Sequence, residues 1–177
     1  MEIKDSGTRK EFDTGAVRDS SEGKGRCDLI PLDVVGNLLR FLNGEKLDEL
    51  AHIEEFKRNK DTHHLTQAIR AFSRRTGIDL VTLILEVSKQ FEEGAKKYTE
   101  NNWKKGIPLH CYIDSGVRHF LKFLRGDTDE PHDRAFVWNL LCACWTYENM
   151  PELDDIEQDL EKEDLKCQLI LETKYEI

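Results

Sequence analysis

One short segment of the chain combines carboxylates with an imidazole. Its members, all within seven residues, are Asp127, Asp129, Glu130, His132 and Asp133. Acidic residues at the start of a helix interact favourably with its macrodipole, but one or two carboxylates are enough for that role. Oxygen ligands are also what a hard cation such as Mg²⁺ prefers. The segment therefore predicts a charged helix start, a metal site, or both.

A second group of polar residues shares one face of the long helix predicted for residues 79–98. At spacings of four, three and four residues, this face carries Glu86, Gln90, Glu93 and Lys97. A solvated side of the helix is the ordinary interpretation. Gly94 slightly favours a site instead, because a mid-helix glycine costs about 1 kcal/mol relative to alanine and often permits the close approach of a ligand.

Three further positions combine polar and apolar character. Asn139 lies in an apolar stretch, residues 135–143, where a buried amide needs hydrogen-bond partners. His119 stands beside Arg118 at the edge of an apolar stripe. Trp103 is flanked by amides and lysines, a mixture that can stack a base and hold a phosphate. A structural role in or near the core is the ordinary interpretation of each.

The elements that position these residues are predicted to be helices. Apolar residues recur at helical spacing in six stretches, and strand-like alternation is not evident. The stretches are residues 32–42, 45–60, 62–76, 79–98, 113–125 and 136–147. The buried stripe expected for the fourth stretch is Ile84, Val87, Phe91, Ala95 and Tyr98. The expected fold is all-α, a bundle of four to five helices in residues 32–150, with an irregular N-terminal arm (1–31) and an acidic tail (151–177).

The composition limits the class of protein. The chain has 177 residues and a formal net charge of −9, which argues against a general nucleic-acid binder, because neutralising phosphates needs surplus lysine and arginine. No apolar run approaches the ~20 residues that span a bilayer, and the first residues lack the apolar stretch of a signal peptide. Five cysteines, an odd number without metal spacing, indicate reduced thiols. We therefore expect a cytoplasmic protein with no nucleic-acid or membrane partner.

The charge is unevenly distributed along the chain. Residues 94–125 hold 7 basic and 2 acidic side chains, whereas residues 126–177 hold 4 basic and 15 acidic ones. Surface salt bridging is the ordinary interpretation, and it contributes little to stability. The sharper hypothesis is an anionic ligand bound by the basic part and a cation bound by the acidic part.

Six short sequence motifs follow one another along the chain. They are residues 25–31 (GRCDLIP), 91–98 (FEEGAKKY), 102–106 (NWKKG), 118–119 (RH), 129–133 (DEPHD) and 138–139 (WN). Together they resemble the dATP/dGTP diphosphohydrolase family, MazZ-like relatives of the MazG-type all-α nucleoside triphosphate pyrophosphohydrolases. The resemblance implies a Mg²⁺- or Mn²⁺-dependent cut between the α- and β-phosphates of a purine deoxynucleoside triphosphate, or its diphosphate, that adjusts the nucleotide pool. Residues 45–75 then look like an insertion in the helical catalytic domain.

The resemblance also implies a set of metal ligands. They would be Glu93, Glu130 and Asp133, with Asp129 and His132 as substitutes. The later Glu-x-x-Asp motif of MazG-type enzymes is complete here, but Lys96 replaces the last glutamate of their earlier Glu-Glu-x-x-Glu motif.

The same motifs imply which residues act in catalysis and which contact the substrate. Lys97 and Arg118 would stabilise charge on the phosphate oxygens, with His119 beside them, and Glu93 would orient or deprotonate the attacking water. The residues expected to contact the substrate are Tyr98, Asn102, Trp103, Lys104 and Asn139, together with Arg26 and Asp28 from a lid formed by the arm.

Two other functions fit these residues. An HD-type metal phosphohydrolase would use the His132-Asp133 doublet with His119, and would release tripolyphosphate or a single phosphate. A non-enzymatic adaptor would instead dock a basic partner on the acidic tail. Enzymes of the type that the sequence resembles tend to accompany phages and prophages and commonly build their site between subunits, so we expect a homo-oligomer in the host cytoplasm.

Overall fold

Six helices dominate the residues that the computed structural model describes, 7–21, 24–43 and 47–156. They are α1 (Leu32–Asn43), α2 (Asp48–Asn59), α3 (Thr62–Thr76), α4 (Leu80–Lys97), α5 (Leu109–Arg125) and α6 (His132–Asn149). Three short 3₁₀ turns are η1 (Cys27–Leu29), η2 (Asn102–Lys105) and η3 (Pro151–Leu153). The all-α class is confirmed, with one helix more than expected. Most of the acidic tail, from residue 157 on, lies outside the described residues.

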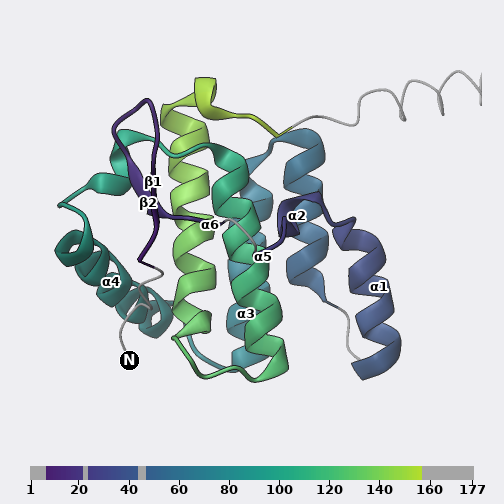
Figure 1. The fold of residues 1–177 in the computed structure, drawn as a ribbon. Helices are drawn as coiled ribbons and strands as arrows, with labels where there is room; N and C mark the ends of the chain where they lie inside the picture. Colours follow the sequence, from purple (N-terminus) through teal and green to yellow (C-terminus); the bar gives the residue numbers. More distant parts are fainter. Residues whose placement is uncertain (1–6, 22–23, 44–46, 157–177) are drawn as a thin grey trace, which may run out of the picture.

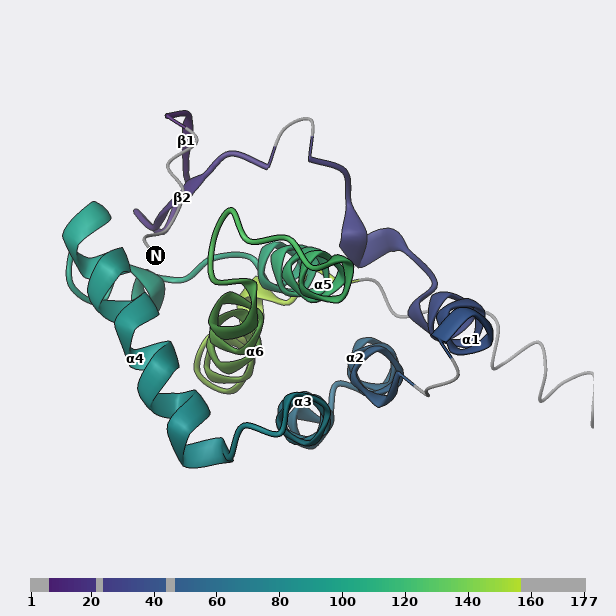
Figure 2. The same ribbon diagram turned by 90° about the horizontal axis from the view of Figure 1, so that it is seen from below.

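Five of the helices run roughly alongside one another, and α4 lies across them. Figure 2 shows α1, α2, α3, α5 and α6 nearly end-on, whereas α4 is seen along its length. The closest packing joins α5 to α6 and α2 to α3 (Figure 1). No helix among the described residues is long and apolar enough to cross a membrane.

Aromatic rings join the helices in one core. Phe72 of α3, Phe120 of α5 and Phe136 of α6 are fully buried, and the Phe136 ring centroid lies 5.0 Å from that of Phe72 and 5.1 Å from that of Phe120. Such pairs contribute about 0.5–1.5 kcal/mol each beyond the burial of their area. Phe56 of α2 is also fully buried. Segment 45–75 thus supplies two helices to the common core.

Aspartates fix the starts of α3 and α4. Asp61 accepts a hydrogen bond from the backbone N of His63 (2.9 Å), and Asp79 accepts from Val81 and Thr82 (both 3.0 Å). These bonds satisfy backbone amides that have no partner within the helix. Both caps lie close to the helix boundaries that the sequence predicts.

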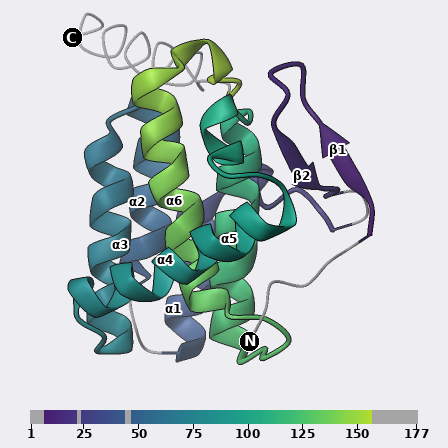
Figure 3. The same ribbon diagram turned by 90° about the vertical axis from the view of Figure 1, so that its left-hand side faces the viewer.

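The N-terminal arm contains a β-hairpin that the sequence pattern did not predict. Strands β1 (Arg9–Glu11) and β2 (Val17–Asp19) pair antiparallel, with Arg9 opposite Asp19. Three residues are too few for the alternation that identifies a strand. Figure 3 shows the hairpin standing beside α5.

The buried side of α4 differs from the predicted stripe. Leu83, Val87 and Gln90 are buried, whereas Ile84 is 55% exposed. Within the described residues α4 packs mainly on α6, because it crosses the bundle instead of joining it. The helix has apolar residues on two sides, so its spacing alone could not decide which side would be covered.

Candidate functional site

A cavity of about 850 Å³ opens between the hairpin, α4, η2, α5 and α6. Its volume falls within the range typical of small-molecule sites. Residues from β2, from the C-terminal half of α4 and from the facing sides of α5 and α6 line it, so it depends on segments far apart in the sequence. The hairpin that forms one wall is visible beside α5 in Figure 3.

Strand β2 is tied to the rest of the cavity wall by side-chain contacts. Asp19 accepts hydrogen bonds from Lys97 Nζ (2.7 Å) and from the Tyr98 hydroxyl (2.9 Å) at the end of α4. The side-chain amide of Asn102 bonds the backbone N and O of Val17, at 3.0 and 2.8 Å. Burial and the neighbouring Asp19 raise the pKa of Tyr98, which keeps its hydroxyl as a donor. The arm is therefore a docked wall of the cavity.

Three cavity-lining side chains carry buried polar atoms that have no hydrogen-bond partner among the described residues. They are the Gln90 Oε1, the Trp138 Nε1 and the Arg18 Nη1. The other terminal nitrogen of Arg18 donates to Asn139 Oδ1 (2.7 Å), and Gln90 is only 8% exposed. A buried polar atom without a partner costs about 1–3 kcal/mol. A ligand that carries two acceptors and one donor would satisfy these two donors and one acceptor.

Cationic groups line another part of the cavity. Arg118 and Lys122 come from α5, and Lys24 comes from the arm. The guanidinium of Arg118 is held by Asp114 (2.5 and 2.6 Å), and Lys122 Nζ lies 3.4 Å from Asp129. A fixed guanidinium beside two ammonium groups is suited to an anionic ligand such as a phosphate.

Two histidines and two carboxylates meet where α5 faces the start of α6. The Nδ1 atoms of His119 and His132 lie 2.9 Å apart, and His132 Nε2 lies 2.8 Å from Asp129 Oδ1. Glu130 Oε1 approaches both rings, at 3.8 Å from His119 and 3.7 Å from His132. Burial, with the charges around it, lowers the pKa of His119 to about 3, so this imidazole is neutral at physiological pH.

These side chains offer donor atoms that could hold a metal ion. One ligand atom each from His119, Glu130 and His132 lie within 4.8 Å of one another, and so do atoms from Asp127, Asp129 and His132. A neutral imidazole is a ligand for transition ions, whereas Mg²⁺ prefers oxygen. The mixed nitrogen and oxygen set therefore fits Mn²⁺ better than Mg²⁺.

The structure brings most of the sequence-predicted site residues to this cavity. Those that line it are Tyr98, Asn102, Trp103, Arg118, His119, Asp129, Glu130 and Asn139. His132 is buried directly behind His119, at 2% exposure.

Other predicted residues lie outside the cavity lining. Glu93 accepts a hydrogen bond from Arg134 Nη2 (2.6 Å), so the structure does not place it with Glu130. Lys97 is bound to Asp19, and Lys104 lies over the ring of Trp103 with its Nζ 5.3 Å from the centroid. Asp133 is half-buried and does not line the cavity.

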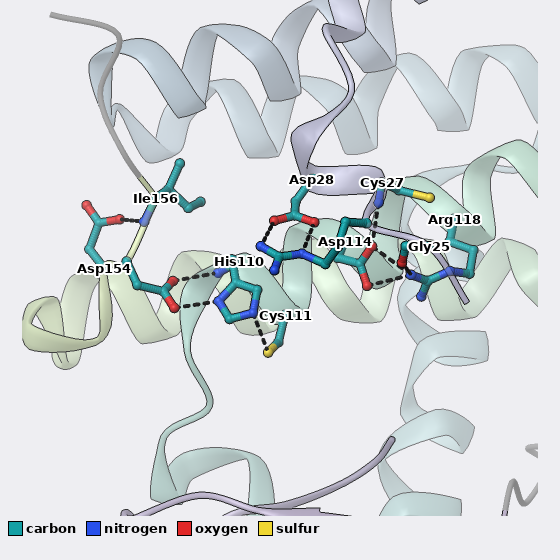
Figure 4. Close-up of polar contacts among 11 residues, drawn as sticks. Gly25, Cys27, Asp28, His110, Cys111, Asp114, Arg118, Asp154 and Ile156 are labelled. Carbon is teal, nitrogen blue, oxygen red and sulfur yellow. Dashed lines mark hydrogen bonds and ion pairs between the residues drawn. The ribbon is translucent and has the colours of Figure 1, made fainter. Parts of the chain in front are cut away.

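Arg26 and Asp28 pair with each other away from the cavity. Their side chains form two hydrogen bonds, at 2.5 and 2.7 Å, in and before η1, which packs on α5. Figure 4 shows Asp28 near His110, which lies at the N-terminus of α5. In this structure they are not part of the cavity wall.

Several cavity residues were not predicted as site residues, among them Lys24 and Lys122 of the cationic wall and the three side chains with unpaired buried atoms. Gln90 carried a signal, since it shares a helix face with Glu93 near Gly94, and Trp138 stands directly before Asn139. No sequence signal pointed to Arg18, because it lies in a strand of three residues within an arm whose sequence is irregular.

The fold is all-α, and its cavity is lined by cationic side chains together with histidine and carboxylate groups. Residues 72–156 match the family model described as dATP/dGTP diphosphohydrolase, N-terminal. The match covers 85 of the 177 residues and agrees with the family that the ordered motifs resemble. The matched segment covers α4, α5 and α6 and so most of the cavity wall, but neither the hairpin nor α2. No curated protein and no solved structure matches the chain.

Proposed function

We propose that this protein hydrolyses purine deoxynucleoside triphosphates between the α- and β-phosphates, giving the monophosphate and pyrophosphate. The observation that carries the proposal is a single cavity that joins unpaired hydrogen-bonding atoms to a cationic wall and a histidine–carboxylate cluster. The family match supports the choice of dATP and dGTP.

The spacing along α6 suits a nucleotide. Trp138 lies six positions after His132 along α6, about 9 Å at 1.5 Å per residue, and Glu130 lies just before the helix begins. This length accommodates a ligand whose base lies near Trp138 and whose phosphates lie near Glu130. Phe91 and Trp103 add ring faces next to the base end, with ring centroids 5.3 Å apart.

The base would be recognised by the unpaired atoms of Gln90, Trp138 and Arg18. A purine carries both donors and acceptors on its edges, so it can satisfy the carbonyl of Gln90 and the N–H groups of Trp138 and Arg18 together. Stacking against an aromatic side chain would hold the ring plane.

The phosphates would be bound by Arg118, Lys122 and Lys24. Positive groups fixed before the reaction stabilise the charge that develops on the non-bridging oxygens without reorganising. Asp114 keeps the Arg118 guanidinium in place from the buried side of α5.

A divalent cation would be held by His119, Glu130 and His132, with Asp129 contacting the other ring nitrogen of His132. Such a cation neutralises phosphate charge and acidifies a bound water. We propose Mn²⁺ ahead of Mg²⁺, because imidazole is among the donors.

The test is to incubate the full-length protein with each deoxynucleoside triphosphate in Mg²⁺ or Mn²⁺ and to quantify all products. We expect dGMP or dAMP with pyrophosphate, and a faster reaction in Mn²⁺. Glu130→Gln should abolish product in either metal, whereas Glu152→Gln, an exposed residue of η3 far from the cavity, should not. Absence of product from every nucleotide would refute the proposal.

The contact between His119 and His132 keeps the HD-type phosphohydrolase as a second candidate. That chemistry releases tripolyphosphate and deoxyguanosine, or a single phosphate. The same product analysis therefore separates the two reactions.

A further inference from the structure

Near the N-terminus of α5, and outside the cavity lining, the side chains of Cys111, His110 and Asp155 contact one another in that order. His110 Nε2 lies 3.3 Å from Cys111 Sγ, and the other ring nitrogen contacts the carboxylate of Asp155, which also accepts from the His110 backbone N (3.0 Å). Figure 4 shows the imidazole of His110 facing the sulfur of Cys111. This order, thiol to imidazole to carboxylate, is the arrangement that activates a nucleophile.

The charges around the imidazole favour its protonated form. The contact with Cys111 and the carboxylate of Asp155 raise the pKa of His110 to about 9, against the effect of burial. Asp28 faces the same ring from η1, and Arg26 lies beside Cys111 and Asp28. Cys111 is also the third residue of α5, where the helix dipole stabilises negative charge.

The other described cysteines lie in different surroundings. Burial raises the pKa of Cys27, of Cys142 and, to about 12, of Cys144. The sulfur of Cys27 lies towards Arg118, whereas that of Cys111 lies towards His110 (Figure 4). Cys27 is half-buried like Cys111, so it provides an internal control of similar access.

Cys111 does not line the cavity described above. Its half-buried sulfur is within reach of a small reagent, so modification of the thiol itself is the chemistry that this geometry supports.

We infer that Cys111 is a nucleophile, activated by His110, that is modified by low-molecular-weight disulfides. The thiolate attacks one sulfur of the disulfide, the sulfur–sulfur bond of the reagent breaks, and a new one joins Cys111 to the attacked sulfur. The leaving thiolate takes the proton from the His110 imidazolium. Electrons and protons balance, with the disulfide as the oxidant.

The first experiment measures the alkylation of each cysteine by iodoacetamide in the full-length protein, resolved by peptide mass spectrometry between pH 5.5 and 9. An ordinary thiol, with a pKa of about 8.5, is only about 1% thiolate at pH 6.5. We expect Cys111 to react at least about tenfold faster than Cys27 at that pH. Equal rates at the two positions would overturn the inference.

His110→Gln tests the role of the imidazole. It should slow alkylation of Cys111 about tenfold at pH 6.5 and leave the rate at Cys27 unchanged. Asp155 is exposed, so Asp155→Asn provides a second variant if His110→Gln does not fold. It should also slow alkylation of Cys111, but by less. An unchanged Cys111 rate in both variants would contradict activation.

The second experiment treats the protein with oxidised glutathione at pH 7 and maps the mixed disulfide. The adduct should form on the peptide of Cys111, more slowly in His110→Gln, and should disappear on reduction. Alkylation of Cys111 without any glutathione adduct would refute disulfides as the modifying class.

Discussion

Gln90 links the stability of the free protein to ligand binding. Its buried Oε1 has no partner among the described residues, which costs free energy until a ligand satisfies it. Gln90→Leu should therefore raise the free energy of unfolding by about 1 kcal/mol and raise the KM for the nucleotide about tenfold. Denaturant unfolding and steady-state kinetics measure the two effects.

Gln67→Leu on α3, away from the cavity, is the matched control and should leave KM unchanged. A Gln90→Leu variant that is less stable and binds the nucleotide as before would show that Gln90 has a purely structural role.

His119 makes the free energy of unfolding depend on pH, and the direction of this dependence follows from its pKa. Its pKa is lowered to about 3 from 6.5, so between these values the unfolded chain binds a proton that the folded chain does not. The stability that is linked to this lowered pKa is fully present above pH 6.5 and is lost as the pH falls towards 3. In metal-free buffer with EDTA, His119→Gln should flatten the pH dependence of the unfolding free energy by up to about one proton in this range. An unchanged slope would contradict the assignment.

At the scale of elements, Asp19 holds the hairpin to the end of α4 through Lys97 and Tyr98. Asp19→Asn removes the charge but retains the size of the side chain. We expect faster proteolysis within residues 7–21 and a severalfold higher KM, because the cavity loses a fixed wall. Asp13→Asn, at the exposed turn of the hairpin, is the control and should behave like the wild type. Limited proteolysis and kinetics together decide the question.

The outer side of α4 supports the proposal of a homo-oligomer. Val81, Ile84 and Leu85 are 55–68% exposed and adjacent on the helix. A contiguous apolar surface of this kind often marks an interface. Ile84→Glu should lower the molar mass measured by light scattering, whereas Arg70→Glu, at an exposed position of α3, should not. A monomeric wild-type protein would remove the proposal.

At the scale of the whole molecule, the cavity exists only because α4 crosses the bundle and the arm returns to it. The boundary between α3 and α4 could be predicted, since the cap Asp79 and the glycine Gly77 act locally, whereas α5 and α6 each begin four residues before the predicted stretch. The hairpin could not be predicted from its three-residue strands. The covered side of α4 could not be predicted either, because Ile84 and Leu83 are equally apolar and only packing on α6 separates them.

The sequence by itself determined the all-α class and the resemblance to the diphosphohydrolase family, since helical periodicity and short ordered motifs are local properties of the chain. Only the tertiary structure decided which polar side chains converge. It placed Arg18 on Asn139, 121 positions away, and paired Glu93 with Arg134 instead of Glu130. The physical reason is that convergence depends on where α4 and the hairpin dock, and no spacing along the chain encodes that.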